Sequence, residues 1–119
     1  MVIDKNGWLI QKVGERVDSF NHHKFKEEIE PLIEKHQLIA LDVQRTAFLS
    51  MTSIMVIVAW AERLINKGGQ MMLIGPSEKL KRQFTIYGSL DHMLVTKPGS
   101  RIPDLSASES PERDESAGF

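Results

Sequence analysis

Short apolar runs alternate along this chain with longer segments in which apolar residues recur every three or four positions. Residues 2–3 and 8–13 flank an Asn-Gly pair, which tolerates the positive φ values that a tight reversal requires. We therefore expect an antiparallel hairpin at the start of the chain. Residues 38–43 and 71–74 are almost continuously apolar, which is typical of strands covered on both faces in a parallel sheet.

Apolar residues with the spacing of amphipathic helices occur in residues 21–35, 52–66 and 77–88. Gly68 follows the second of these segments, and glycine often ends a helix because it adopts the left-handed conformation readily. Pro31 lies inside the first segment, where we expect it to bend the helix or end a turn. A last strand is expected within residues 90–95.

The alternation of strands and helices with short connections predicts an α/β fold with parallel pairing and right-handed crossovers. We expect a small mixed β-sheet, made of the N-terminal hairpin and βαβ units and covered by helices. This domain is predicted to span residues 1–96. From residue 97 onward, serine, proline and acidic residues dominate, and too little apolar surface is present to offset the cost of ordering. Residues 97–119 are therefore predicted to be a disordered tail.

Composition narrows the classes of function. The 119 residues include no cysteine, which excludes disulfides, thiolate catalysis and thiolate metal sites. The formal net charge is −1 without a long basic run, so we expect no nucleic-acid partner. The longest apolar run, residues 54–61, is far shorter than the roughly 20 residues that cross a bilayer. We expect no membrane insertion and no secretory signal, and we take the cytoplasm as the default location.

Motifs of catalysis and metal binding are missing from the sequence. The adjacent histidines His22 and His23 would point in different directions on a helix, and no pair of histidines has the spacing of one helical turn. Neither a Walker-type phosphate loop nor a Gly-x-Ser-x-Gly elbow occurs. We therefore expect no metal, no cofactor and no enzymatic activity. A stand-alone enzyme built on the same arrangement of sheet and helices stays an alternative, beside the two binding functions considered below.

Hydroxyl side chains gather where the second helix is predicted to begin. Ser50, Thr52 and Ser53 can accept hydrogen bonds from the unpaired N–H groups of a first helical turn. The helix dipole also favours negative charge at this end, so a phosphate there would not melt the helix. These three residues are either simple caps or candidate phosphorylation sites, and the pattern leaves both interpretations open.

The second predicted helix is apolar nearly all round. We expect one stripe to face the sheet: Ile54, Ile57, Val58, Ala61, Leu64 and Ile65. Met55, Val56 and Trp60 then point toward neighbouring helices or outward. If they point outward, they would form a docking or homodimer patch, because contiguous exposed apolar surface usually marks an interface.

Three stretches of this chain resemble the STAS family, which includes the anti-sigma-factor antagonists. They are residues 16–21, 41–54 and 68–74, and the resemblance extends over roughly residues 2–95 in the same order of elements. It implies a STAS-like fold and a partner switch. The domain would bind an anti-sigma factor that is also a serine kinase of the histidine-kinase-like ATPase fold. That kinase would phosphorylate a hydroxyl at the start of the second helix.

The chain departs from the family motif at that helix start. Ser50 stands where aspartate is usual, Met51 stands at the usual phosphorylated position, and Ser53 replaces a glycine. The family's kinase-contacting loop corresponds to residues 18–21, although Asp18, Ser19 and Asn21 are equally good caps for the first helix. The predicted partner-binding residues are Asp18, Ser19, Asn21, Ser50, Met51, Thr52, Ser53, Met55, Val56 and Trp60.

An alternative function comes from other members of the same family. Some STAS domains are accessory subunits of lipid-transporting ABC systems, where they dock on the ATPase. The near-neutral charge and the apolar second helix fit that role as well. Recovery of either kind of ATPase as the bound partner would separate the two interpretations.

Overall fold

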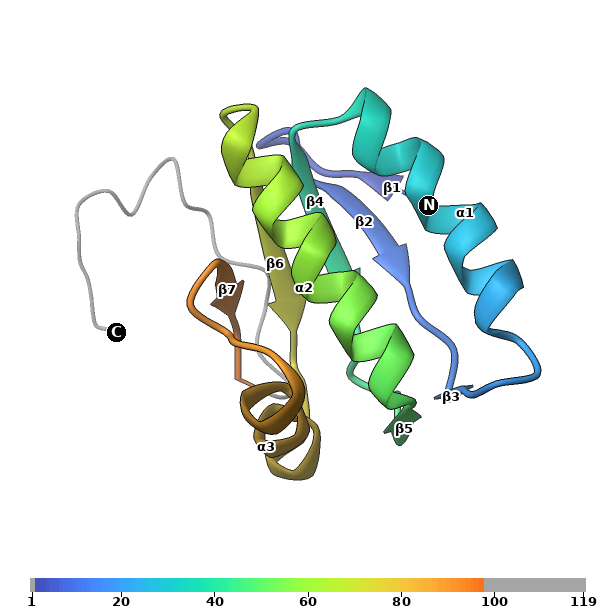
Figure 1. The fold of residues 1–119 in the computed structure, drawn as a ribbon. Helices are drawn as coiled ribbons and strands as arrows, with labels where there is room; N and C mark the ends of the chain where they lie inside the picture. Colours follow the sequence, from blue (N-terminus) through green and yellow to red (C-terminus); the bar gives the residue numbers. More distant parts are fainter. Residues whose placement is uncertain (1, 98–119) are drawn as a thin grey trace.

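Five strands form the main sheet of the protein, in the order β1-β2-β4-β6-β7 (Figure 1). The structure is a computed structural model and describes residues 2–97. Its elements are β1 (Val2–Ile3), β2 (Leu9–Lys12), β3 (Arg16–Val17), α1 (His22–Lys35), β4 (Leu38–Asp42), β5 (Phe48–Leu49), α2 (Met51–Asn66), β6 (Gln70–Ile74), α3 (Glu78–Tyr87) and β7 (Met93–Val95). Apart from Lys97, the predicted tail of residues 97–119 lies outside the described residues.

The strand pairing confirms the predicted α/β class. β1 and β2 are antiparallel, with Ile3 opposite Leu9, and the expected hairpin joins them. Asp4 closes its turn, because the carboxylate Oδ1 accepts hydrogen bonds from the backbone N–H groups of Asn6 and Trp8, both at 2.9 Å. β2, β4, β6 and β7 are parallel neighbours, so each connection between them crosses over the sheet.

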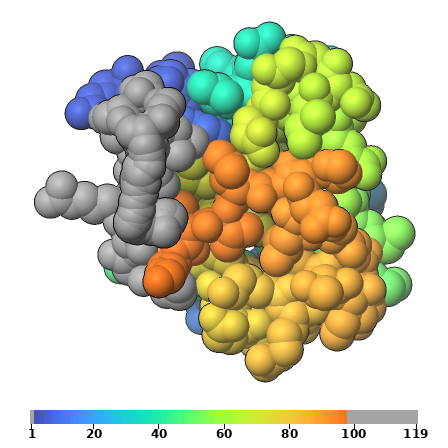
Figure 2. Space-filling model, turned by 90° about the vertical axis from the view of Figure 1, so that its left-hand side faces the viewer, coloured from blue at the N-terminus to red at the C-terminus, as the bar shows by residue number. Residues whose placement is uncertain are grey.

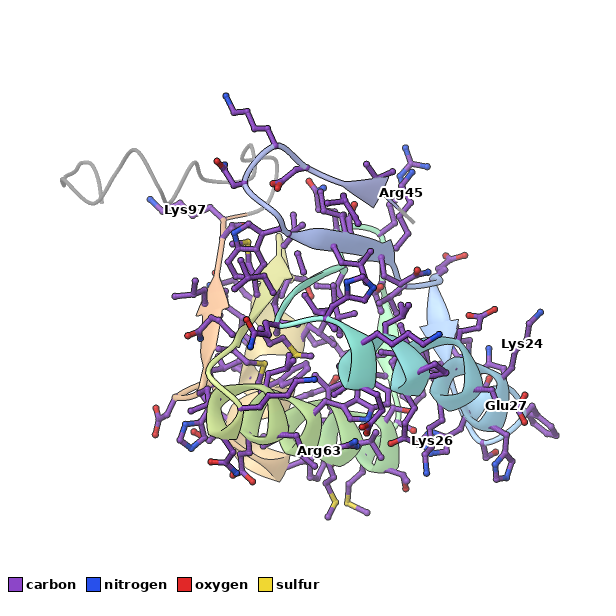
Figure 3. All side chains as sticks on the ribbon, turned by 90° about the horizontal axis from the view of Figure 1, so that it is seen from above. Lys24, Lys26, Glu27, Arg45, Arg63 and Lys97 are labelled. Atoms are coloured by element: carbon purple, nitrogen blue, oxygen red, sulfur yellow. The ribbon has the colours of Figure 1, made fainter. Side chains whose placement is uncertain are left out.

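All three described helices contribute to the core on one face of the sheet (Figures 1 and 3). There the buried strand residues Leu9, Ile39 and Met71 form one apolar cluster with side chains of α1, α2 and α3. Seen from the side in Figure 2, the segment that carries β7 lies between α3 and the C-terminal end of α2. The opposite face has an apolar cluster of its own, composed of Trp8, Ala40, Met72 and Ile74.

Pro31 does not end the first helix, because α1 continues through it to Lys35. Proline removes one backbone donor from a helix interior, so one carbonyl in the preceding turn loses its partner. Pro31 is exposed, and water reaches that side of the helix. Solvation of the unpaired carbonyl therefore limits the cost of keeping the helix whole.

Two adjacent glycines after α2 serve different purposes. Gly68 has a φ of 86°, and its position past the helix end confirms the predicted left-handed stop. Gly69 is required for space: a Cβ atom there would lie 2.1 Å from the carbonyl oxygen of Gln37. That close approach brings the start of β6 to β4, where the Gln70 N–H donates to the same carbonyl at 2.8 Å.

Candidate protein-docking site

Two very short parallel strands bring the loop before α1 to the start of α2. β3 pairs with β5, so that Arg16 lies opposite Phe48 and Val17 opposite Leu49. The backbone N–H of Ser50 also donates to the carbonyl of Val17 at 2.9 Å. No strand was predicted between residue 43 and the second helix, so β5 is an element that the sequence analysis missed. The two-stranded piece places two segments about 30 positions apart in one surface region (Figure 1).

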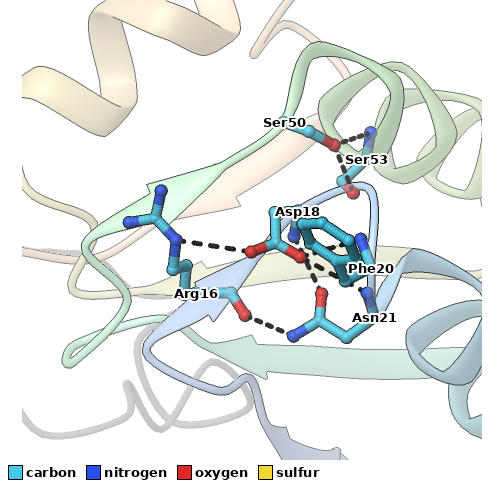
Figure 4. A network of polar contacts seen from close by, with 6 residues as sticks. All are labelled: Arg16, Asp18, Phe20, Asn21, Ser50 and Ser53. Carbon is cyan, nitrogen blue, oxygen red and sulfur yellow. Dashed lines mark hydrogen bonds and ion pairs between the residues drawn. The ribbon is translucent and has the colours of Figure 1, made fainter.

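The start of α2 has the capping geometry that its hydroxyl side chains predicted. Ser50 is the N-cap residue, with extended backbone, and its Oγ accepts a hydrogen bond from the Ser53 N–H at 3.2 Å. The two hydroxyls are also hydrogen-bonded to each other, with 2.9 Å between their oxygens (Figure 4). The hydrogen bond from the Ser53 N–H confirms the cap interpretation of Ser50, whose side chain is half-buried.

Ser53 is an internal residue rather than a surface residue. Its side chain has no exposed surface, and its Oγ lies 2.9 Å from Nδ1 of His22 on α1. The predictions of Ser53 as a phosphorylation site and as a direct partner contact are therefore wrong, because neither a kinase nor a partner reaches a buried hydroxyl. Ser53 instead links the start of α2 to the first turn of α1.

The hydrogen-bonded histidine in this linkage has a lowered pKa. Desolvation of the His22 ring is the largest cause, and the nearby positive charges of Lys26 and His23 lower the pKa further. The folded state therefore binds a proton at His22 less readily than the unfolded chain does. The contribution of His22 to stability is present above its unfolded pKa and is lost as the pH falls through its folded pKa.

The linkage predicts a pH-dependent difference between the natural chain and His22→Gln. As the pH falls from 8 to 5, the Tm of the natural chain should decrease more than that of His22→Gln, because only the natural chain has to protonate this ring. Thermal unfolding followed by circular dichroism across that range measures the gap in Tm between the two chains at each pH. A gap that stays constant with pH would contradict the prediction.

The loop between β3 and α1 is closed by its own side chains. Asp18 Oδ1 accepts from the N–H groups of Phe20 and Asn21 at 2.9 and 3.3 Å, and Asn21 Oδ1 accepts from the Asp18 N–H at 2.8 Å (Figure 4). Asn21 Nδ2 donates to the Arg16 carbonyl at 2.9 Å. Asn21 occupies the N-cap position but makes no side-chain cap bond. The capping interpretation is thus wrong for Asn21, whose side chain holds the loop.

Arg16 fastens this loop to β5. Its Nε lies 3.4 Å from Asp18 Oδ2, and its guanidinium carbon lies 4.6 Å from the centre of the Phe48 ring. The first contact is an ion pair and the second a cation–π contact, both partly exposed and each worth about 1 kcal/mol or less. Together with the hydrogen bonds of Asp18 and Asn21, they fix the path of the loop.

The fixed loop holds Phe20 out into solvent, with 95% of its surface exposed. The sequence predictions missed Phe20 as a site residue, since it was grouped with the polar cap residues around it. The signal that could have identified it is a large aromatic side chain within a cluster of turn-forming residues, where no helix or strand pattern assigns it to a core.

On α2 the predicted contact residues divide into two groups. Met51 and Met55 are each 52% exposed, and Thr52 is exposed beside them. Val56 is partly buried against the core. Trp60 is only 1% exposed, so the interpretation that it points toward a neighbouring helix is confirmed and its prediction as a docking residue is wrong.

The structure explains the burial of Trp60. Its indole N–H donates to Glu30 Oε2 at 3.1 Å, and its ring centre lies 5.5 Å from that of Phe25. This hydrogen bond is the main reason that the pKa of Glu30 is lowered. The buried stripe of α2 is therefore turned toward α1 relative to the prediction, which leaves Ile65 37% exposed.

The described residues show no arrangement for metal chemistry. Within residues 2–97, no group of three or more potential metal-binding side chains comes together. Asp42, at the end of β4, accepts hydrogen bonds from the backbone and side-chain nitrogens of Gln44 at 3.1 and 3.2 Å. The helices of the described part include none that is long and apolar enough to cross a membrane.

Comparison with known proteins agrees with the fold. A protein of Thermotoga maritima provisionally assigned as an anti-sigma factor antagonist has a similar fold, with a TM-score of 0.66 at 22% identity, over 79% of this chain and 81% of that one. The anti-sigma factor antagonist SpoIIAA in its unphosphorylated form has a TM-score of 0.61 at 15% identity, over 76% of this chain and 80% of the other. The chain therefore has the fold of the anti-sigma factor antagonists. No curated protein sequence matches it.

The model of the STAS domain family matches residues 1–101. The chain thus belongs to the STAS family.

Proposed function

We propose that this protein is an anti-sigma-factor antagonist, which binds an anti-sigma factor through the surface made by the loop before α1 and the start of α2. We call this the docking surface and define it by Asp18, Ser19, Phe20, Met51, Thr52 and Met55. Membership of the STAS family supports this proposal, as does the likeness in fold to SpoIIAA and to the provisionally assigned antagonist of Thermotoga maritima.

The observation that carries the proposal is the exposure of three large apolar side chains on a fixed frame. Phe20, Met51 and Met55 contribute little to the core of this chain, because half or more of each is exposed. Aromatic and methionine side chains are enriched in the central contacts of protein interfaces. The hydrogen bonds of Asp18 and Ser50 hold the backbone beneath them in one conformation. A partner therefore meets an apolar contact area whose shape is set before binding.

We further propose that the protein acts by binding and not by catalysis. The pair that comes nearest to a nucleophile and its base is Ser53 with His22, at 2.9 Å. No part of the Ser53 side chain is exposed, and its hydroxyl is also engaged by Ser50. A substrate would have to displace the start of α2 to reach it, so this pair is suited to structure.

Among the three hydroxyl candidates, Thr52 is the residue that we propose a partner kinase modifies. Thr52 is exposed in the first turn of α2, whereas Ser50 is half-buried in its cap bonds and Ser53 is buried. A phosphate there lies at the positive end of the helix dipole, so the domain keeps its fold. Modification would act on binding, through charge placed beside Met51 and Met55.

Substitution of Phe20 tests the docking surface. The Phe20→Ala variant should bind the anti-sigma factor encoded in the same cell, a histidine-kinase-like ATPase, at least about 10-fold more weakly. Its Tm should stay within about 2 °C of the natural value, because the side chain is almost wholly exposed. Titration calorimetry and thermal unfolding measure the two quantities.

The matched control for this experiment is Ile3→Ala. Ile3 is another exposed apolar residue, 59% accessible, on the edge strand β1 at the far end of the sheet from the docking surface. This variant should bind with the natural affinity. Equal weakening by both substitutions, or no weakening by Phe20→Ala, would contradict the proposed surface. Recovery of an ABC-transporter ATPase in place of the anti-sigma factor would contradict the proposed function itself.

A further inference from the structure

The docking surface consists of two halves that belong to different segments of the chain. Residues 18–20 belong to the loop before α1, and the other members lie in the first turns of α2. Pairing of β3 with β5 joins the backbones that lead into the two halves, but it comprises only two residue pairs. Within residues 2–97, one side-chain hydrogen bond joins the halves themselves, in which Nδ1 of His22 lies 2.9 Å from Oγ of Ser53.

Water cannot take the place of His22 in this bond. The Ser53 side chain has no exposed surface, and its only other side-chain partner among the described residues is Ser50, at 2.9 Å. Ser50 in turn is the N-cap of α2, whose Oγ accepts from the Ser53 N–H. A buried hydroxyl that loses its acceptor is not resolvated, so a change at His22 is passed to the cap of α2.

The three side chains have one arrangement of hydrogens in which both hydroxyl hydrogens find acceptors. The Ser50 hydroxyl donates to Oγ of Ser53, and the Ser53 hydroxyl donates to Nδ1 of His22. This arrangement requires a neutral imidazole ring that carries its proton on Nε2, because only an unprotonated Nδ1 accepts a hydrogen bond.

The surroundings of His22 favour the neutral ring. Desolvation is the largest cause of its lowered pKa, followed by the positive charges of Lys26 and His23 on α1. The loop before α1 supplies one acid, Asp18, whose carboxylate is engaged by Arg16 and by backbone N–H groups. The first turns of α2 supply no charged side chain. His22 is also the first residue of α1 and contacts the first turn of α2, and the positive ends of both helix dipoles oppose a charged ring there.

We propose that His22 is a positioning residue of the docking surface, whose neutral ring holds the two halves together and whose protonation weakens partner binding. A proton on Nδ1 removes the acceptor of the Ser53 hydroxyl, which then has to turn toward Ser50. The hydrogen of the Ser50 hydroxyl loses its own acceptor as a result. Freedom gained by the two halves has to be lost again when a partner binds, and that loss lowers the affinity. The inference rests on the proposed function, because it concerns the same surface.

The coupling of the two halves can be tested in the free chain by NMR. Between pH 8 and pH 5, the ε-methyl signal of Met51 and the amide signal of Phe20 should shift with the same midpoint as the Cε1–H signal of His22. Both shifts should be absent in His22→Asn, because the amide oxygen of asparagine accepts a hydrogen bond but does not titrate. The matched control is His23→Ala, which removes the neighbouring histidine and should keep both shifts.

Calorimetric titration of the same chains with the anti-sigma factor tests the effect on binding. Between pH 7.5 and pH 5.5, the Kd of the natural chain should rise at least about threefold more than that of His22→Asn, because only the natural chain gains a proton at this ring. His23→Ala should follow the natural chain. At pH 7.5, the Kd of His22→Asn should lie within about twofold of the natural value, and His22→Ala should bind at least about fivefold more weakly. Use of one partner for all chains cancels the pH dependence of the partner itself.

Two results would overturn the positioning role of His22. One is an affinity that falls with pH as steeply in His22→Asn as in the natural chain, and the other is a pair of Met51 and Phe20 signals that do not follow the titration of His22. If His22→Ala does not fold, the natural chain, His22→Asn and His23→Ala decide the question by themselves. Absence of binding by every chain at both pH values, with the NMR shifts present in the free natural chain, would contradict the proposed function and still show that His22 holds the two halves together.

Discussion

The Trp60→Ala variant is expected to lose about 3–5 kcal/mol of unfolding free energy. The substitution removes a buried indole from between α1 and α2, where it lies against Phe25, and leaves a cavity. It also removes the N–H that Glu30 accepts at 3.1 Å. In a domain of this size the Tm should fall by well over 10 °C, measured by calorimetry or circular dichroism.

Trp60→Phe serves as the control for this variant. It keeps most of the buried ring volume and removes only the hydrogen bond, while Glu30 keeps its contact with Arg63 at 3.2 Å. The unfolding free energy of Trp60→Phe should therefore fall by only about 1–2 kcal/mol. If Trp60→Ala unfolded at the natural temperature and instead weakened partner binding, the buried position would be wrong and the docking interpretation would return.

Phosphorylation of Thr52 is expected to weaken binding of the anti-sigma factor at least about 100-fold. A phosphate adds a charge of about −1.5 to −2. Beside Met51 and Met55 it would enter a mostly apolar contact on binding, where the loss of its hydration costs free energy and weakens the complex. The Thr52→Glu variant should reproduce part of this loss. Calorimetric titration of the anti-sigma factor into each form measures it, after mass spectrometry has located the phosphate.

Thr52→Gln separates charge from size in that experiment. Glutamine has nearly the shape of glutamate without its charge, so the affinity of this variant should stay within about threefold of the natural one. Equal weakening by Gln and Glu would show that bulk and not charge acts at this position. A phosphate found on Ser50 in place of Thr52 would contradict the assignment of the modified hydroxyl.

Local patterns in the sequence were sufficient for the regular part of the fold. The hairpin follows from its Asn-Gly turn, and the caps at Ser50 and Ser77 follow from serine at helix starts. The strands β4 and β6 follow from their continuous apolar runs. Each of these features depends on residues close together in the chain, which is why a single sequence predicts it.

Features set by contacts between distant residues could not be predicted. A two-residue strand such as β5 has no periodicity, and its identity depends on the approach of β3. The α2 sequence is apolar nearly all round, so its spacing did not fix which side faces α1, and Trp60 was misassigned. The sequence gives no sign of the constraint on Gly69, which is set by the carbonyl of Gln37 in the connection just before β4.

The pairing of β3 with β5 has a consequence for the thermodynamics of recognition. Two peptide segments that would otherwise have to find each other in the encounter complex are already joined by backbone hydrogen bonds. The loss of configurational freedom that accompanies their ordering is incurred once, when the polypeptide folds, and not again at each encounter. At the proposed docking surface, affinity would then be determined by the side chains that it displays, so individual substitutions would change it without altering the backbone beneath.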